Sequence, residues 1–301
     1  MSLAVAFLGL GTMGSRQAAA LARAGFDLTV YNRTLERARA WSEEHGGRVA
    51  TSPDEAAHGA DVVITMVVDG AQVEDLLFGS EGAARTAAPG TLFVDMSTIA
   101  PGDARRIGSR LAEAGHSFLD APVSGSAAKA AEGTLTIMVG GDAADLERAR
   151  PLLEAMGEQV IHAGPLGHGQ SIKLIHNAVA AVNLAVLAQG LVLGDRTGVD
   201  LDALMAVLAA GAAGSAMLDR KGEAMRRHDF TPMFQLDHML KDLRLCLEEA
   251  ASAKVPFPLA GSAADAYAAA SAQGLGEQDF GAVLVAAELL ANHRLERDPG
   301  A

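Results

Sequence analysis

Two side chains that could carry out proton transfer stand four residues apart in the middle of the chain. A helix would place Lys173 and Asn177 on one face, because residues at i and i+4 are neighbours on its surface. A lysine amine shielded from water has a lowered pKa and can act as a general acid or base, with the asparagine amide holding it in place. A lysine that reaches solvent from the end of a helix fits the same spacing equally well.

A turn rich in hydroxyl groups and backbone amides precedes this pair. The sequence there is Asp120-Ala121-Pro122-Val123-Ser124-Gly125-Ser126, at the end of a short apolar run. Such a turn can bind a carboxylate with neutral donors alone, although Ser-Gly-Ser is also a common loop sequence. The expected ligand is a small anionic substrate, contacted by Ser124, Gly125 and Ser126.

A glycine-rich turn follows the first apolar run of the chain, residues 3–8. It reads Gly9-Leu10-Gly11-Thr12-Met13-Gly14 and leads into an Ala-rich helical stretch and a second strand-like run, residues 27–31. This is the order of a dinucleotide-binding βαβ unit, in which amides at the helix N-terminus bind the pyrophosphate. We expect Gly9 to form the turn, Gly11 to let the backbone approach the phosphates, and Gly14 to allow close helix packing.

The end of the second strand indicates which cofactor is preferred. An NAD site usually has an acid here that accepts from the ribose 2′-hydroxyl, but this chain has Tyr31-Asn32-Arg33-Thr34. The Arg33 guanidinium can pair with a 2′-phosphate, with Asn32 and Thr34 as neutral donors. NADP is therefore favoured over NAD. The alternative is that Arg33 is only a solvated residue at the start of a helix.

Further strand-like runs alternate with helical stretches and predict an α/β fold, a doubly wound Rossmann sheet. The runs cover residues 61–68, 91–96, 117–121, 134–139 and 159–162. Because such sheets bind ligands beyond the carboxyl ends of their strands, Met66, Val67, Val68 and Thr98 are placed to line the cofactor. The Met66 group could equally belong to the core, and Thr98 could equally cap the helix after Pro101.

A long helix is predicted over residues 167–197. It carries no charge from Leu174 to Gly194, which passes the usual screen for a membrane span. Its His176, Asn183 and Gln189 and the lack of a basic flank favour instead a helix buried between two domains or two subunits.

Only helical periodicity follows this helix, over residues 201–210, 215–227, 235–253, 259–273 and 280–295. The sequence therefore predicts two domains. A cofactor-binding Rossmann domain would cover residues 1–164, and an all-α domain that begins with the long helix would cover residues 165–301.

The composition of the chain argues against two classes of binding partner. The 37 acidic and 24 basic residues give a net charge of −13, which disfavours nucleic acid and anionic membranes. The single cysteine, Cys246, cannot form an internal disulfide, and the N-terminal segment does not resemble a signal peptide, so a cytoplasmic protein is expected. The His and Cys residues show no metal-ligand spacing.

Five motifs together resemble the β-hydroxyacid dehydrogenases over nearly the whole chain. They are Gly9 to Gly14, Asp95-Met96-Ser97-Thr98, Asp120 to Gly125, the Gly169, Lys173 and Asn177 spacing, and Lys241-Asp242-Leu243. The pattern is similar to 3-hydroxyisobutyrate dehydrogenase. Asn32-Arg33-Thr34 and Ser124-Gly125-Ser126 look most like its glyoxylate and succinic semialdehyde reductase branch.

The resemblance implies an NAD(P)-dependent oxidoreductase with a Rossmann domain, a long interdomain helix and a helical domain, assembled as a homodimer or homotetramer. It implies that Lys173 is catalytic with Asn177 supporting it, and that Ser124 and Gly125 hold the substrate carboxylate. Thr98 and Lys241 would lie near the cofactor, and Phe234 would pack beside the substrate. This chain departs from many relatives at two positions of the substrate loop. Those relatives have glycine where Ser126 stands and an acid at the place of Ala131, whereas here the acid is Glu132.

Three other interpretations remain open. The His176-Asn177 pair also resembles the 6-phosphogluconate dehydrogenases, in which a histidine beside the asparagine could contact substrate, but a packed helix histidine is the simpler expectation. Imine reductases share the architecture and usually lack the lysine. A non-catalytic cofactor-binding domain is the alternative from another functional class.

Overall fold

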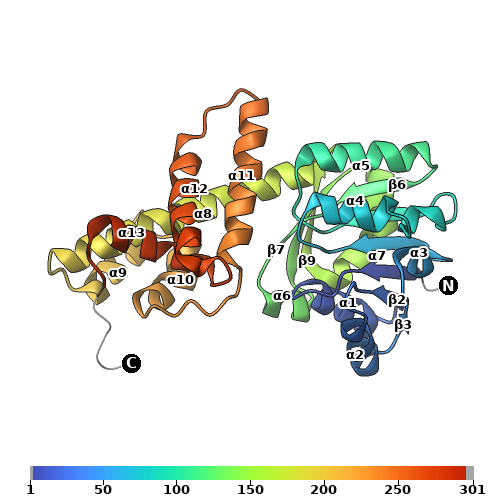
Figure 1. Ribbon diagram of the computed structural model, residues 1–301, viewed down its shortest axis with the longest axis horizontal. Coiled ribbons are helices and arrows are strands. Elements are labelled where there is room, and N and C mark those ends of the chain that lie inside the picture. Colours follow the sequence, from blue (N-terminus) through green and yellow to red (C-terminus); the bar gives the residue numbers. More distant parts are fainter. Residues whose placement is uncertain (1–2, 296–301) are drawn as a thin grey trace. The chain divides into compact units, whose positions relative to one another are not determined.

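The computed structural model describes residues 3–295 (Figure 1). The chain forms two compact units, the first ending at Lys173 and the second beginning at Leu174. This boundary lies inside one continuous helix, α8 (His168–Arg196), whereas the sequence predicts a boundary after residue 164. The first turn of α8 groups with unit 1, where its Gln170 is hydrogen-bonded to Asp120 at the end of one strand and to Ser97 in the loop after another.

Unit 1 is built on a nine-stranded sheet with the order β3-β2-β1-β4-β5-β6-β8-β7, and β9 pairs with β8. Strands β1 to β6 pair in parallel, in the order of a dinucleotide-binding sheet, and β8 runs antiparallel to β6 and β7. The predicted doubly wound fold is confirmed. The strands are β1 (Ala4–Leu8), β2 (Asp27–Tyr31), β3 (Arg48–Val49), β4 (Val62–Thr65), β5 (Leu92–Asp95), β6 (Ser117–Asp120), β7 (Val123–Ser124), β8 (Leu135–Gly140) and β9 (Gly157–Gly164).

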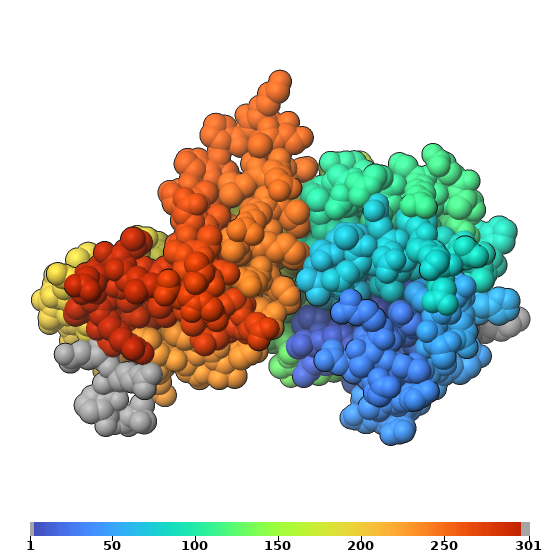
Figure 2. Space-filling view, viewed as in Figure 1, coloured from blue at the N-terminus to red at the C-terminus, as the bar shows by residue number. Residues whose placement is uncertain are grey.

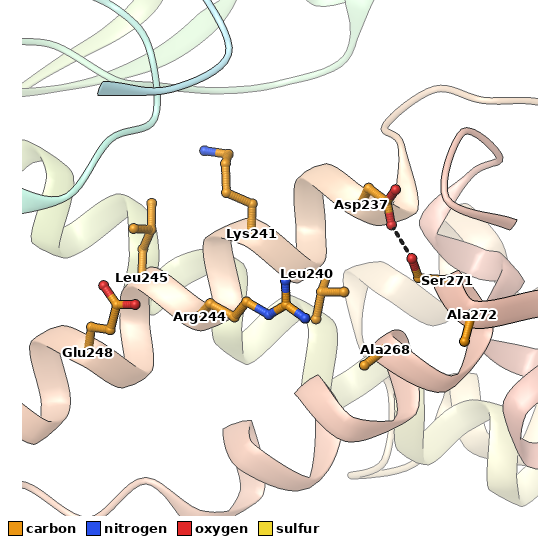
Figure 3. Close-up of a pocket in the computed structure, with 9 residues that line it drawn as sticks. All are labelled: Asp237, Leu240, Lys241, Arg244, Leu245, Glu248, Ala268, Ser271 and Ala272. Atoms are coloured by element: carbon orange, nitrogen blue, oxygen red, sulfur yellow. Dashed lines mark hydrogen bonds between the residues drawn. The ribbon is translucent and has the colours of Figure 1, made fainter. Parts of the chain in front are cut away.

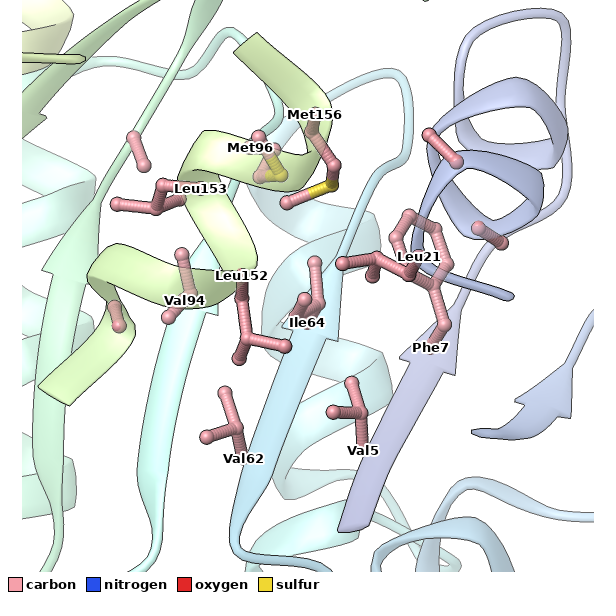
Figure 4. Close-up of a cluster of buried hydrophobic side chains, with 14 of the residues drawn as sticks. Val5, Phe7, Leu21, Val62, Ile64, Val94, Met96, Leu152, Leu153 and Met156 are labelled. Carbon is pink, nitrogen blue, oxygen red and sulfur yellow. The ribbon is translucent and has the colours of Figure 1, made fainter. Parts of the chain in front are cut away.

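Helices cover both faces of this sheet, which explains why its strands are continuous apolar runs. In β1, Val5 and Phe7 face the cluster beneath α1 and α7, whereas Ala6 and Leu8 face the cluster beneath α3, α4 and α5. Figure 4 shows the first of these clusters, in which side chains of α7 and α1 meet those of β1, β4 and β5. The helices are α1 (Gly14–Arg23), α2 (Leu35–His45), α3 (Pro53–Ala57), α4 (Gly70–Phe78), the 3₁₀ helix η1 (Ala83–Arg85), α5 (Pro101–Glu113), α6 (Ala127–Glu132) and α7 (Ala143–Met156).

Unit 2 is helical, as predicted. After α8 come α9 (Leu201–Ala210), α10 (Ala216–Arg226), α11 (Leu236–Ser252), α12 (Pro258–Ala270), the π-helical turn η2 (Ser271–Leu275), the 3₁₀ helix η3 (Phe280–Ala282) and α13 (Val283–Ala291). The α11–α12 hairpin projects beyond the rest of the unit (Figures 1 and 2). Exposed apolar side chains, Val255 and Leu259, lie at and beside its tip.

Helix α8 is, within residues 3–295, the one helix long and apolar enough to cross a membrane. Just over half, 56%, of its most apolar window is buried in the structure. Leu174, Ala178, Ala181 and Leu184 lie on the buried side, in the core that α8 shares with α10 to α13. This burial is typical of the central helix of a helical core.

Candidate functional site

The glycine-rich turn between β1 and α1 needs its glycines for different reasons. Gly9 has a φ of +106°, and a Cβ there would lie 2.4 Å from the carbonyl oxygen of Met66. A Cβ on Gly14 would lie 2.0 Å from the carbonyl oxygen of Gly9, so α1 starts directly against the turn. A Cβ on Gly11 would meet no atom of the described chain within 4 Å. The turn is therefore tight against the protein at two glycines and open at the third.

The start of α1 fits a phosphate ligand. Its N-cap residue, Met13, makes no side-chain capping hydrogen bond within residues 3–295. Amides at an uncapped helix N-terminus, together with the positive end of the helix dipole, form a site for a pyrophosphate. The turn is held in place from the neighbouring strand, because the Leu10 amide donates to Asn32 Oδ1 at 3.0 Å.

In the segment after β2, one polar side chain holds the loop and others are exposed. Both polar atoms of the Asn32 side chain are hydrogen-bonded, since its Nδ2 also donates to the Thr34 carbonyl at 3.0 Å. Arg33 and Thr34 are exposed, and Thr34, the N-cap of α2, makes no side-chain capping bond in the described part of the chain. A second exposed arginine, Arg37, was not singled out from the sequence, although it lies in the first turn after Arg33. The basic groups here are Arg33 and Arg37, and Asn32 holds the loop.

The loops after β4 and β5 are joined side by side. The buried Ser97 hydroxyl accepts from the Val67 amide at 2.9 Å, which links the Met66 to Val68 segment to the loop that carries Thr98. Val68 is 43% exposed, whereas Met66 packs against the sheet core. The N-cap of α5 is Ala100, so Thr98 is not the residue that caps this helix.

Asp120, at the end of β6, anchors the start of α8. Its side chain is fully buried, and its two oxygens accept from the Gly167 amide at 2.7 Å and the Gln170 amide at 2.8 Å. Burial raises the pKa of Asp120 to about 6, although the two amides act in the opposite direction. From the sequence, Asp120 is recognisable only as part of a motif, and its role cannot be predicted because its partners lie 47 and 50 residues away.

The loop after Asp120 contains the predicted carboxylate-binding residues. Ser124 pairs with Thr136 of β8 and is half-buried. Gly125 has a φ of +149°, and a Cβ there would lie 2.6 Å from a methyl carbon of Leu135. Ser126 is the N-cap of α6 and accepts from the Lys129 amide at 3.3 Å. The Ser126 hydroxyl thus has a structural use that the sequence prediction did not consider.

In unit 2, Asn177 belongs to a chain of polar contacts. Its amide donates to Asp242 Oδ2 at 2.6 Å, and the Lys241 amine lies 2.9 Å from the other oxygen of Asp242. His176 Nδ1 lies 3.0 Å from Asn177 Oδ1, and His176 is exposed rather than packed as expected. Asp242 is 1% exposed, and the sequence indicates it only as part of the Lys241-Asp242-Leu243 motif. Lys173 precedes Asn177 by four residues on the continuous helix α8.

The loop that carries Phe234 is held by a buried ion pair. Asp279 Oδ2 accepts from the Lys221 amine at 2.7 Å and from the amides of Met233 and Phe234 at 3.0 and 3.3 Å. The Phe234 ring packs edge-on against Phe280, with ring centroids 5.8 Å apart. Lys221 and Asp279 therefore fix the position of Phe234 within unit 2, and neither was predicted from the sequence.

A groove of about 610 Å³ lies between α11 and α12 (Figure 3). Lys241, Arg244 and Glu248 line it from α11, and the Asp237 carboxylate accepts from the Ser271 hydroxyl at 2.6 Å at one end. Figure 3 shows the Lys241 amine pointing away from Ala268 and Ala272. Lys241 is the one predicted site residue among the residues that line this groove.

A second cavity, of about 340 Å³, lies in unit 1 and is lined by Asp61, Thr91 and Arg148, among others. Asp61 and Thr91 immediately precede β4 and β5, so this cavity is at the amino ends of the strands. Ligands of doubly wound sheets bind at the carboxyl ends. The cavity is therefore not a candidate for the cofactor.

Comparisons with known proteins agree with the fold and with the glycine-rich turn. Residues 4–164 match the family model for the NAD binding domain of 6-phosphogluconate dehydrogenase. Residues 167–287 match the model for the NAD-binding region of NADP-dependent 3-hydroxyisobutyrate dehydrogenase. The two models together cover both units.

Three similar proteins illustrate the range of activities for which such relatives are named. The chain is 39% identical to an NAD-dependent L-serine dehydrogenase of Pseudomonas aeruginosa, over 93% of this chain and 96% of that protein. It is 34% identical to glyoxylate/succinic semialdehyde reductase 1 of Arabidopsis thaliana, over 94% and 97%. The solved structure of a Mycobacterium tuberculosis 3-hydroxyisobutyrate dehydrogenase with L-serine is 35% identical, covers 95% and 99% of the two chains, and superposes with a TM-score of 0.86.

These similarities span nearly the full length of the chain and include the segments that form the glycine-rich turn, the Ser124 loop and helix α8. The family predicted from the five sequence motifs is confirmed. The chain belongs to the β-hydroxyacid dehydrogenase family of NAD(P)-dependent oxidoreductases, which act on the alcohol group of hydroxy acids.

Proposed function

We propose that this enzyme prefers NADP(H) and interconverts a small hydroxy acid and the corresponding aldehyde or keto acid, of the 3-hydroxyisobutyrate, succinic semialdehyde or glyoxylate type. One observation carries the proposal. The glycine-rich turn, the Ser124 loop and the start of α8, as far as Lys173, all belong to unit 1 and adjoin the carboxyl ends of its parallel strands. Such an edge is where a doubly wound sheet binds its ligands.

The Gly9 to Gly14 turn and the uncapped start of α1 would bind the cofactor pyrophosphate. Arg33, exposed and next to the exposed Thr34, would pair with the 2′-phosphate, and residues 31–34 contain no acid to repel it. Met66, Val67, Val68 and Thr98 would line the rest of the cofactor, with Lys241 near it. When bound, the nicotinamide supplies or accepts the hydride.

The substrate carboxylate would be bound by the Ser124 hydroxyl and by the backbone amides around Gly125. Ser126 would contribute through its backbone, because its hydroxyl caps α6. This arrangement places the acid group of a short substrate at one end of the site and leaves its carbonyl or alcohol carbon for the nicotinamide. Phe234 would supply an apolar contact.

Lys173 would transfer the proton that accompanies hydride transfer. In reduction its ammonium donates to the oxygen of the carbonyl group, and in oxidation its neutral amine removes the hydroxyl proton. The cation also stabilises negative charge that develops on that oxygen. Asn177, one helical turn further along α8 and held by Asp242, would keep the lysine in its productive rotamer.

We also propose that the enzyme is a cytoplasmic homodimer or homotetramer. Exposed apolar residues recur at a spacing of seven along α8, at Val179, Val186 and Leu193, and Val255 is exposed at the tip of the α11–α12 hairpin. A second copy of the chain would remove these side chains from water. Neither nucleic acid nor a membrane is an expected partner of a chain with a net charge of −13.

The proposal is tested by assaying turnover with NADPH and NADH against a panel of short aldehyde and keto acids, with uncharged aldehydes of the same length as controls. We expect turnover of at least one acid with NADPH, at a higher kcat/KM than its uncharged analogue. Cofactor binding without turnover of any acid in the panel would contradict the proposed substrate class.

A further inference from the structure

We propose that Gln170 is a positioning residue of the reaction: its side chain fixes the rotation of the first turn of α8 against the strand-end loops and thereby sets where the Lys173 amine lies. This inference rests on the proposed role of Lys173 as the proton donor and acceptor. The residues that carry it all belong to unit 1.

The Gln170 side chain is fully buried and uses both ends of its amide. Its Nε2 donates to the Ser97 carbonyl at 2.8 Å, and its Oε1 accepts from the Ile99 amide at 3.1 Å. These two backbone groups flank Thr98, a residue that we expect to contact the cofactor. A paired donor and acceptor on one planar amide allows only one orientation of the helix face that carries it.

The axial position of α8 is set separately, by Asp120. This carboxylate accepts from the Gly167 and Gln170 amides, at the end of the helix where the dipole favours negative charge. Gly169 lies flush against the sheet, because a Cβ there would be 2.4 Å from the Met138 carbonyl oxygen. The Asp120 bonds hold the helix end in place, and the Gln170 side chain controls how the helix turns about its own axis.

The rotation of the helix directly affects the position of Lys173, because Lys173 follows Gln170 by three residues. At about 100° per residue, the two side chains leave the helix within about 60° of each other, one turn apart. A lysine amine about 8 Å from the helix axis moves by more than about 1 Å when the helix rotates by about 10°. A misplacement of about 1 Å can reduce a rate by about a hundredfold.

The test uses Gln170→Met, which keeps the length and volume of the side chain but removes both hydrogen bonds. We expect kcat to fall by about tenfold to a hundredfold, while the KM for the acid and the Kd for NADPH change by less than about threefold. Gln170→Glu keeps one acceptor oxygen but turns a carboxylate oxygen toward the Ser97 carbonyl, so it should lose kcat in the same way. Gln189→Met, at an exposed position of the same helix, is the matched control and should retain kcat.

A double-mutant cycle with Lys173→Ala distinguishes an effect through Lys173 from a general loss of active structure. If Gln170 acts through Lys173, Gln170→Met should lower kcat no further in the Lys173→Ala background. Additive losses would overturn the inference and leave Gln170 with a structural role, as would wild-type kcat in folded Gln170→Met. If Gln170→Met does not fold, the same two criteria apply to Gln170→Glu.

The failure of this inference can be told apart from failure of the proposed function. Collapse of kcat in Lys173→Ala with full kcat in Gln170→Met would remove only the positioning role. Near wild-type kcat in Lys173→Ala would remove the proposed proton transfer, and the positioning role with it.

Discussion

The Asp120 carboxylate accepts a hydrogen bond of 2.8 Å from the Gln170 amide, and this bond ties the end of β6 to the first turn of α8. The acid is fully buried, and Asp95 is the charged group that adds to the effect of burial on it. The bond thus joins the part of the chain that carries the Ser124 loop to the helix that carries Lys173.

A pH dependence of stability follows from the pKa of Asp120, which burial raises from 3.8 to about 6. Because the pKa is higher in the folded protein, the stability due to Asp120 is fully present below about pH 3.8 and is lost as the pH rises through about 6. The difference corresponds to about 3 kcal/mol. Between pH 4 and 7, the free energy of unfolding of the wild type should therefore fall relative to that of Asp120→Asn. Urea unfolding of both proteins measures this, and a difference that does not change with pH would contradict it.

Arg33→Ala should weaken NADPH binding by about tenfold to more than a hundredfold, because a charge-assisted contact with the 2′-phosphate is lost. NADH has no 2′-phosphate, so its Kd should change little. Arg39→Ala, an exposed arginine further along α2, serves as the control. Titration of both cofactors tests the assignment, and equal weakening of NADPH and NADH would place the 2′-phosphate elsewhere.

Ser124→Ala should raise the KM for acid substrates by about tenfold, since one donor to the carboxylate is removed, and should affect an uncharged aldehyde much less. Ser126→Ala should leave this KM nearly unchanged, because the Ser126 hydroxyl caps α6. Steady-state kinetics on matched charged and uncharged substrates decide the question. Equal losses on both substrates would show that Ser124 does not bind the carboxylate.

Lys221→Met should destabilise the protein by about 3–5 kcal/mol, because it leaves the buried Asp279 carboxylate without its cation. The exposed pair of Arg150 and Glu147 provides the comparison, and Arg150→Ala should change stability little. Chemical denaturation of both variants measures the effect. A Lys221→Met variant as stable as the wild type would mean that the Phe234 loop does not depend on this ion pair.

The sequence was sufficient to predict the fold, because strands, glycine turns and helical periodicity are local signals. The glycine-rich turn was recognisable for the same reason, since Gly9 and Gly14 are dictated by contacts within the turn and with the next strand. What could not be predicted was which distant polar groups would meet. Asp120 and Gln170 are 50 residues apart, and Lys221 and Asp279 are 58 residues apart. No spacing rule connects residues at such separations.

Short elements were also missed. The strands β3 and β7 have two residues each, too few to show an alternation of apolar and polar side chains. The pairing of β7 with β8 determines the orientation of Ser124. The sequence predicts substrate binding by Ser126 because it lies in a turn rich in hydroxyl groups and backbone amides. Its use as the cap of α6 depends on where that short helix begins, which composition alone does not indicate.

The most direct test of the mechanism is kcat of Lys173→Ala on the best acid substrate, with the Kd for NADPH measured on the same preparation. We predict that kcat falls by about 10²- to 10⁴-fold while the Kd stays within about threefold, because the glycine-rich turn still binds the pyrophosphate. Lys173→Arg, which keeps the cation but does not lose its proton, should be similarly impaired in the oxidative direction. Near wild-type kcat for Lys173→Ala would contradict the account and leave Lys173 as a residue of the helix end without a part in catalysis.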